Sequence, residues 1–275
     1  MHQPARMNGM SRERLSPSYE IGIARTEREV EAASRVRHAV FVEEAGALGH
    51  LITTPGVETV DVDRYATHLV ARDNGRVIGT VRVQEPTPAL ADGRRPIFGM
   101  AGEEHYDYAP LRDAGVRFVE IGRSAVLRAH RSPRVISDLW KAAFLLANRR
   151  GKDHFIGIVQ VNFTDSLDDA RIVHAKLARD GALHPRFDLR GRSKASPPER
   201  AEYPILSDAE RAAPESVSLP TLFTLFRRIG LRACGAPVFM ADTRRVGLAM
   251  LAGPDTFPPV TKRFFATPDP AIRLD

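Results

Sequence analysis

The chain has 275 residues, of which 43% are hydrophobic and 27% charged, so it suits one large domain or two small ones and is not disordered as a whole. Arginine dominates its net charge of +6, but no lysine run or interleaved aromatic pattern predicts a nucleic-acid groove. A single cysteine, Cys234, excludes a disulfide scaffold and favours a cytoplasmic setting. No apolar run approaches the roughly 18 residues of a membrane span, and peripheral membrane contact is left open.

The first third of the chain is predicted to be a tail followed by alternating strands and a helix. Residues 1–18 are polar and contain two prolines, which predicts a disordered tail. Alternation predicts a strand at 19–24, and Thr26 with Glu29 forms a capping box at the start of a helix. The next two strands are predicted at 68–71 and 77–83, joined by an Asp-Asn-Gly hairpin turn.

The stretch 118–151 is predicted to be the central unit of the fold. An apolar, β-branched run at 118–127 predicts a strand that carries Glu120 and Arg123 in its middle. After a basic turn, apolar residues spaced by three and four predict an amphipathic helix that ends at Gly151. The free N–H groups at the start of that helix, beside an arginine-rich turn, predict an anion site.

The rest of the chain is predicted to complete one sheet. The apolar run 154–161 predicts a central strand, and a helix follows to about Arg179. The segment 181–218 is rich in proline and charge, which predicts a solvated loop or insertion, or a lid. Further elements are predicted as a helix at 219–231, strands at 237–240 and 246–251, and a proline-rich tail that wraps the surface from 253 to 275. Strands and helices in this mixed order predict an α/β fold around one mixed sheet.

Short motifs at the joints of this order carry a family resemblance. They are Arg37-x-x-Val40-Phe41 with Glu43 and Glu44, Asp61-x-Asp63-x-Tyr65, Gly79-Thr80-Val81-Arg82, Glu120-x-Gly122-Arg123, and Phe226 to Arg232 in the late helix. Together they resemble the GNAT acyltransferase superfamily. Within it, they are most similar to the acyl-carrier-protein-dependent branch of ornithine-lipid N-acyltransferases, N-acyl amino acid synthases and acyl-homoserine-lactone synthases.

The resemblance implies a fold and an activity. The fold is a central mixed, mostly antiparallel sheet flanked by helices, in one acyltransferase domain over 19–252 with the insertion or lid at 181–218 and the tail at 253–275. The enzyme would belong to lipid biosynthesis. It would move a medium- or long-chain acyl group from a phosphopantetheine thioester, on an acyl carrier protein or CoA, to an amino acid such as ornithine. Three alternatives stay open: an acyl-homoserine-lactone synthase, an acetyl-CoA-dependent acetyltransferase, and a non-catalytic domain that binds acyl carriers.

The donor side of the implied site surrounds the turn before the central helix. Arg131 and Arg134, with the helix N-terminus, would hold a phosphate, and backbone N–H groups near Ala125 and Val126 would polarise the thioester carbonyl. Acetyl-CoA enzymes of the superfamily carry glycines in this turn, whereas residues 132–134 here read Ser-Pro-Arg. Proline has no N–H to offer, so the turn favours the single phosphate of a carrier-bound phosphopantetheine over the pyrophosphate of CoA.

The acceptor side of the implied site centres on Glu120. A carboxylate within an apolar strand has a raised pKa, which suits a general base acting on the amine, and the alternative is that Glu120 only pairs an arginine in the sheet. Residues 120 and 123 share a face only if a β-bulge lies between them, as the superfamily implies. Arg123 and Arg82 would bind a substrate carboxylate or fix Glu120.

Further acceptor-side candidates come from the first helix and the acidic loop. Arg37, Phe41, Asp61 and Asp63 would close the acceptor pocket, where acidic groups attract an amine. The tyrosine that many acetyltransferases use as general acid corresponds here to Phe226, which has no proton to give. The histidines show no metal-ligand spacing, so no metal is expected.

Overall fold

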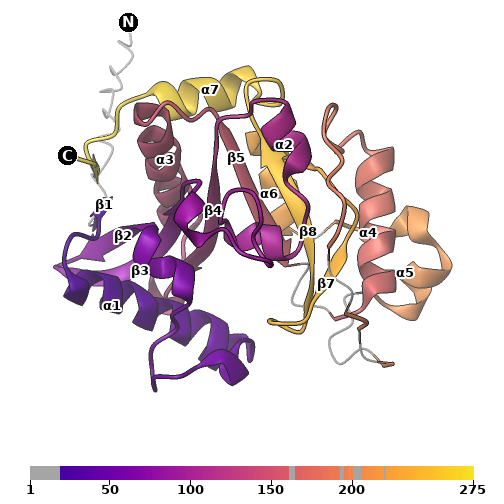
Figure 1. Cartoon of the computed structure of the whole chain (residues 1–275), viewed down its shortest axis with the longest axis horizontal. Coiled ribbons are helices and arrows are strands. Elements are labelled where there is room, and N and C mark those ends of the chain that lie inside the picture. Colours follow the sequence, from indigo (N-terminus) through magenta and orange to yellow (C-terminus); the bar gives the residue numbers. More distant parts are fainter. Residues whose placement is uncertain (1–18, 161–164, 193–194, 198, 201–205, 220) are drawn as a thin grey trace, which may run out of the picture.

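The structure, a computed structural model, describes residues 19–160, 165–192, 195–197, 199–200, 206–219 and 221–275 (Figure 1). Its strands are β1 (Tyr19–Ile23), β2 (Thr67–Asp73), β3 (Arg76–Gln84), β4 (Phe118–Val126), β5 (His154–Gln160), β6 (Arg232–Ala233), β7 (Val238–Met240), β8 (Arg245–Ala252) and β9 (Ile272–Arg273). Its α-helices are α1 (Glu27–Arg37), α2 (Ala109–Asp113), α3 (Pro133–Arg149), α4 (Leu167–Arg179), α5 (Asp208–Ala212), α6 (Thr221–Ile229) and α7 (Pro259–Ala266). The predicted tail at 1–18 lies outside the described residues.

One mixed sheet runs through the molecule in the order β6-β8-β5-β4-β3-β2-β1-β9, with β7 paired to β8. The pairs β4–β5 and β1–β9 are parallel, and the other pairs are antiparallel. The predicted central, mostly antiparallel sheet is therefore confirmed. Its central parallel pair is short, because register partners run only from Phe118 and His154 to Glu120 and Ile156.

The two faces of the sheet have different chemistry, because successive side chains of a strand point to opposite faces. On β3, Val81 and Val83 join the main apolar cluster under α3, whereas Arg82 faces the other way and shares Asp63 with Arg37 of α1. Helices α1 and α3 therefore cover opposite faces. Apolar packing dominates beneath α3, and buried charged groups lie beneath α1.

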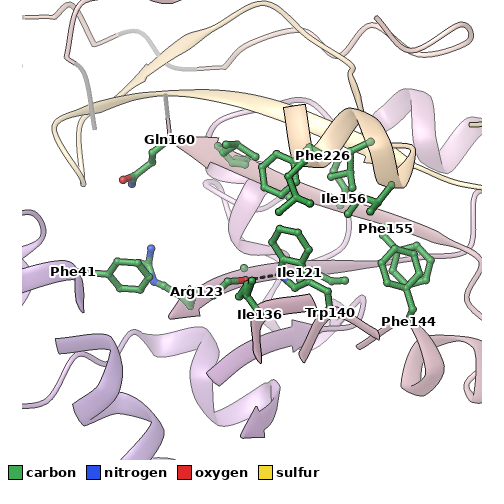
Figure 2. Close-up of a pocket in the computed structure, with 18 of the residues that line it drawn as sticks. Phe41, Ile121, Arg123, Ile136, Trp140, Phe144, Phe155, Ile156, Gln160 and Phe226 are labelled. Carbon is green, nitrogen blue, oxygen red and sulfur yellow. Dashed lines mark hydrogen bonds between the residues drawn. The ribbon is translucent and has the colours of Figure 1, made fainter. Parts of the chain in front are cut away.

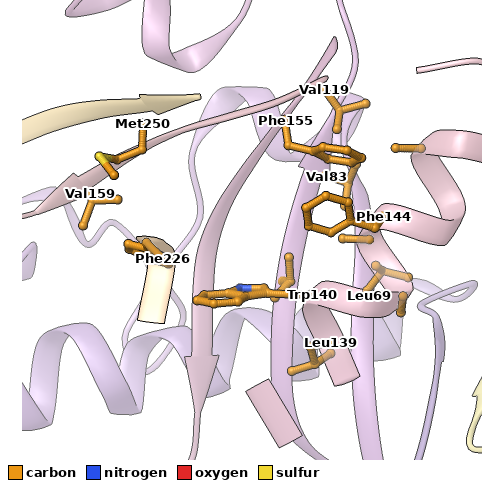
Figure 3. Packing of buried hydrophobic residues seen from close by; sticks show 14 of the residues in the cluster. Leu69, Val83, Val119, Leu139, Trp140, Phe144, Phe155, Val159, Phe226 and Met250 are labelled. Atoms are coloured by element: carbon orange, nitrogen blue, oxygen red, sulfur yellow. The ribbon is translucent and has the colours of Figure 1, made fainter. Parts of the chain in front are cut away.

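The main core forms where α3, α6 and α7 pack on the sheet (Figure 3). Phe144 of α3 stacks on Phe265 of α7 with ring centroids 3.7 Å apart and lies 3.6 Å from the ring of Phe155 on β5. Trp140 meets Phe226 of α6 at 5.1 Å. A buried aromatic side chain contributes about 1.5–3 kcal/mol through the apolar area it removes from water, so this layer anchors α3 to the centre of the sheet.

The predicted elements are found near their predicted positions, with three differences. The first helix continues as a π-helical segment, η1 (His38–Glu44). The described part of 181–218 is not solvated throughout, because Phe187 and Leu189 join a second core cluster. The C-terminal tail forms α7 and the edge strand β9, since the prolines at 258–259 start a helix instead of preventing one.

Candidate active site

The divergence of β4 from β5 opens the centre of the sheet. At this point an added Cβ on Gly157 would lie 2.6 Å from the carbonyl oxygen of Ile121, so only glycine allows this approach. Further along β4 the pairing with β3 shifts, because Arg82 faces Gly122 and Thr80 faces Ala125. Two β4 residues, Arg123 and Ser124, thus oppose one β3 residue, and Arg123 has φ +50°. The predicted β-bulge is therefore present.

An apolar cavity of about 320 Å³ lies in this opening, against α3 and α6 (Figure 2). Phe41 and Arg123 lie at one end, and Phe144 and Phe155 lie at the other. Trp140 lines the middle and donates a hydrogen bond from Nε1 to Ser124 Oγ at 3.1 Å. The remaining lining is mostly aliphatic and aromatic, from Ile121, Ile136, Ile156, Ile158, Val159, Leu225, Phe226, Ile229 and Leu231. Such a cavity suits a hydrocarbon chain.

A second, polar cavity of about 240 Å³ holds Glu120 and Arg82. The two cavities share five lining residues of β4 and β5, namely Ile121, Gly122, Arg123, Ile158 and Gln160. They meet where the two strands separate. A molecule in the apolar cavity and one in the polar cavity would therefore touch across the opening in the sheet.

Glu120 is buried in the polar cavity and is held by few partners. Its Oε2 accepts a hydrogen bond from the Gly102 backbone N–H at 2.8 Å, and its Oε1 lies 3.9 Å from Arg82 Nη2. Burial raises the pKa of Glu120, and the Arg82 charge and the Gly102 N–H oppose that shift without cancelling it. An added Cβ on Gly102 would overlap the Tyr108 hydroxyl, so glycine is required for this donor to reach Glu120. The raised pKa makes this carboxyl a better proton acceptor than an exposed glutamate.

Asp63 organises a buried network of charges beneath α1. It accepts bonds from Arg37 at 2.6 and 3.1 Å and from Arg82 at 3.2 Å. Burial pushes the pKa of Asp63 up, but the Arg37 and Arg82 charges outweigh it and hold the pKa well below its usual range. Glu58 joins the network, pairing Arg37 at 2.6 Å and Arg123 at 3.2 Å. Arg37 and Asp63 therefore serve to hold other side chains and, unlike Arg82, do not line the polar cavity.

The donor-side residues lie beyond the bulge. Val126 O accepts a hydrogen bond from Arg131 at 3.1 Å, while its neighbour Leu127 donates from its N–H to Ile78 O on β3. Because N–H and C=O groups alternate in direction along a strand, the Val126 N–H points away from β3 and that of Ala125 points towards it. Of the two predicted donors to a thioester carbonyl, only Val126 has its N–H directed away from β3, and neither residue lines either cavity.

The basic residues near α3 do not form one continuous patch. Arg131 pairs Glu44 at 2.8 Å, and Arg134 pairs Asp138 at 3.4 Å. Arg149 and Arg150 lie at the other end of this 17-residue helix, about 25 Å away. Arg128 is exposed and has no carboxylate partner among the described residues.

The structure brings most predicted site residues together, but sequence reasoning missed several. Glu120, Arg123, Arg82 and Asp61, which were predicted for the acceptor side, line the polar cavity, and Phe41 lines the apolar one. Asp61 is paired to Arg95 at 2.8 Å. The missed residues are Gly102, Glu104, His105, Tyr108, Asp242 and Thr243. They lie in turns and loops outside β4, either 12 to 18 residues before Glu120 or more than a hundred residues after it, and no local pattern connects them to it.

Two features are absent from the described part of the chain. No group of three or more acidic, histidine or cysteine side chains there could hold a metal ion. Within the same residues, no helix is both long and apolar enough to cross a membrane.

Comparison with known proteins agrees with this geometry. A profile of the acetyltransferase (GNAT) domain matches residues 36–141. The chain is 34% identical over 183 residues to the L-ornithine N(alpha)-acyltransferase of Rhodobacter capsulatus, an alignment that covers 62% of this chain and 68% of the relative. It is 33% identical over 148 residues to the enzyme of the same description from Agrobacterium fabrum, covering 50% of this chain and 49% of that relative. The chain thus spans about half the length of the second relative.

A solved structure shares the fold. The N-acyl amino acid synthase FeeM, from uncultured soil microbes, superposes with a TM-score of 0.51 at 12% identity, covering 86% of this chain and 89% of that one. The matched profile and the curated relatives place the chain among the acyltransferases. The chain belongs to the GNAT family and is an N-acyltransferase.

Proposed function

We propose that this enzyme transfers a medium- or long-chain acyl group from a phosphopantetheine thioester on an acyl carrier protein to the α-amine of an amino acid, with ornithine as the leading acceptor. The observation that carries the proposal is the meeting of an apolar and a polar cavity at Ile121, Gly122 and Arg123. The relatives named as L-ornithine N(alpha)-acyltransferases support the acceptor. The product, an N-acyl amino acid, is a lipid.

The apolar cavity supports a long acyl chain. Its wall runs from Arg123 past Trp140 to Phe144 and Phe155, and carbon atoms make up most of it (Figure 2). Each methylene group moved from water into such a wall contributes about 0.8 kcal/mol. A long chain therefore gains affinity along the cavity, whereas an acetyl group would leave most of it empty.

The polar cavity supports proton transfer at Glu120. A neutral amine beside Glu120 attacks the thioester carbonyl carbon, a C–N bond forms, and the C–S bond breaks. Glu120 takes the proton lost by nitrogen and passes it to the departing sulfur, so that the carboxylate is ionised again at the end. The N–H of Val126, which points away from β3, is the candidate donor to the oxyanion. Arg82 and Arg123 offer positive charge to the acceptor carboxylate.

The start of α3 supports a donor that carries one phosphate. Pro133 occupies the first helical position and has no N–H, and Ser132 Oγ already accepts from Val135 N–H. Arg131 remains near the helix start, half exposed. This arrangement offers fewer donors than a pyrophosphate would need, and it favours carrier-bound phosphopantetheine over CoA.

The test is an assay of purified protein with acyl carrier protein or CoA thioesters of increasing chain length, with ornithine as acceptor and mass spectrometry as readout. We expect N-acylornithine, with the highest kcat/KM for long chains on the carrier protein. Turnover of acetyl-CoA, with no turnover of longer acyl thioesters, would overturn the assignment of a medium- or long-chain acyl group. An acyl lactone formed from S-adenosylmethionine would replace the acceptor assignment.

A further inference from the structure

The turn that joins β7 to β8, residues 241–244, forms one wall of the polar cavity. Thr243 is only 4% exposed, and its Oγ has no hydrogen-bond partner among the described residues. Asp242 Oδ1 is also buried without a hydrogen bond there. Buried polar atoms are nearly always satisfied, so two orphaned oxygens on one cavity wall point to a missing hydrogen-bond donor. An ammonium group is such a donor.

The charge of this wall is negative. His105 is the nearest cation candidate for Asp242, with its Nε2 3.6 Å from Oδ1, which is too long for a hydrogen bond. Burial lowers the pKa of His105, and the Asp242 charge only partly opposes that shift, so the imidazole is neutral near pH 7. Glu104 lies on the same cavity, 3.7 Å from both Arg94 and Arg95.

The cavity also carries positive charge from Arg82 and Arg123. Arg82 is 5% exposed and shares its charge with Asp63, while Arg123 is 18% exposed and reaches Glu58. Glu120 lies on β4 with Arg123, in the same cavity. The cavity therefore offers both guanidinium and carboxylate groups, as a ligand with an anionic and a cationic end would require.

We propose that Asp242 and Thr243 form a subsite for a second, side-chain ammonium group of the acceptor. The acceptor carboxylate then faces Arg82 and Arg123, and its α-amine faces Glu120. This inference rests on the proposed function and adds to it the residues that select dibasic amino acids. An ammonium ion paired with Asp242 stays protonated, so the same contact directs acylation to the α-nitrogen.

The experiment compares ornithine with norvaline, which has the same carbon chain without the side-chain amine. We expect wild-type kcat/KM to favour ornithine about 10- to 100-fold, the range of a charge-assisted hydrogen bond. Asp242→Asn should reduce this ratio about tenfold or more, mainly through the KM for ornithine. Thr243→Val, which keeps the side-chain shape, should reduce it by a smaller factor. Asp113→Asn removes an exposed carboxylate on α2 and should keep the wild-type ratio.

The outcomes separate this inference from the proposed function. A wild-type ratio near one, or a ratio that survives in both Asp242→Asn and Thr243→Val, overturns the subsite while ornithine acylation stands. If no amino acid is acylated, the proposed function fails, and the subsite is judged by thermal shift of the wild-type protein. Stabilisation by ornithine and not by norvaline then supports it, and equal shifts overturn it. Melting curves of each variant show that a changed ratio comes from folded protein.

Discussion

Glu120 illustrates how burial and a sparse set of partners prepare one side chain for proton transfer. Glu103 is a second buried carboxylate, but it accepts three backbone N–H groups, from Ile97, Phe98 and Met100. Glu103 is thereby fixed as a structural acceptor. Glu120 accepts one backbone bond and keeps a raised pKa, with Arg82 at the edge of ion-pair distance. The two carboxylates differ in partners more than in burial.

The first prediction compares these two carboxylates. Glu120→Gln should lower kcat by roughly 10²–10⁴ with little change in melting temperature, because glutamine keeps an acceptor for Gly102 N–H but cannot take a proton. Glu103→Gln should instead lower the melting temperature, because its amide N–H group faces backbone donors. Kinetics and melting curves are measured on the same preparations. A fully active, folded Glu120→Gln enzyme would remove Glu120 from the chemistry.

Asp63 connects three elements of the fold: through Arg37 and Arg82 it joins the segment before β2 to α1 and β3. We predict that Asp63→Asn destabilises the fold at pH 7 by about 3–5 kcal/mol, since both guanidinium groups lose a buried counter-charge. The depressed pKa makes this contribution complete above the unfolded carboxyl pKa of about 3.9 and progressively lost as pH falls below it. Urea denaturation of both proteins from pH 7 to pH 3 should show a difference that narrows below about pH 4. A difference independent of pH would assign the effect to packing.

The aromatic contact between α3, α7 and β5 sets the closed end of the apolar cavity. We predict that Phe144→Leu shifts the preferred acyl chain to greater length, because it removes ring atoms from the cavity wall. Phe265→Leu is the matched control, because it loses the same 3.7 Å stacking contact but does not line the cavity. Chain-length profiles and melting temperatures are compared. An equal shift in both variants would indicate loosened packing as the cause.

At the scale of the whole molecule, most arginines are neutralised locally, and the net charge of +6 gives little guidance to a docking surface. We predict that Arg128→Ala and Arg131→Ala each raise the KM for an acyl carrier protein thioester several-fold with a smaller effect on kcat. Arg149→Ala, at the far end of α3 and paired with Asp275, should leave that KM unchanged. Equal effects at both ends of the helix would mean that only total charge matters.

The sequence predicts the order of elements well, because periods of 2 and 3.6 residues are local properties. It also places Glu120 and Arg123 on one strand, although the bulge between them followed only from the family resemblance. The partners of those residues could not be predicted. Gly102 approaches Glu120 from a 3-10 turn, and Asp242 reaches the same cavity from a hairpin more than a hundred residues later. Such pairings depend on how strands are ordered in the sheet, which local patterns do not encode.

The short parallel pairing of β4 with β5 also affects how the molecule holds together. Only three register pairs join the β6-β8-β5 half of the sheet to the half that runs from β4 to β9. Among residues 121–124 and 157–160, the backbone amides that point into this seam and not towards β3 or β8 should therefore exchange with deuterium faster than those within β3 or β8. An acyl donor substrate bound in the opening would contact both halves. At a concentration a hundredfold above its Kd, it would add about 2.7 kcal/mol to the free energy of unfolding. Hydrogen exchange of the enzyme with and without the acyl donor tests this contribution. If exchange slows only at the amides of the seam, the bound substrate holds the two halves of the sheet together.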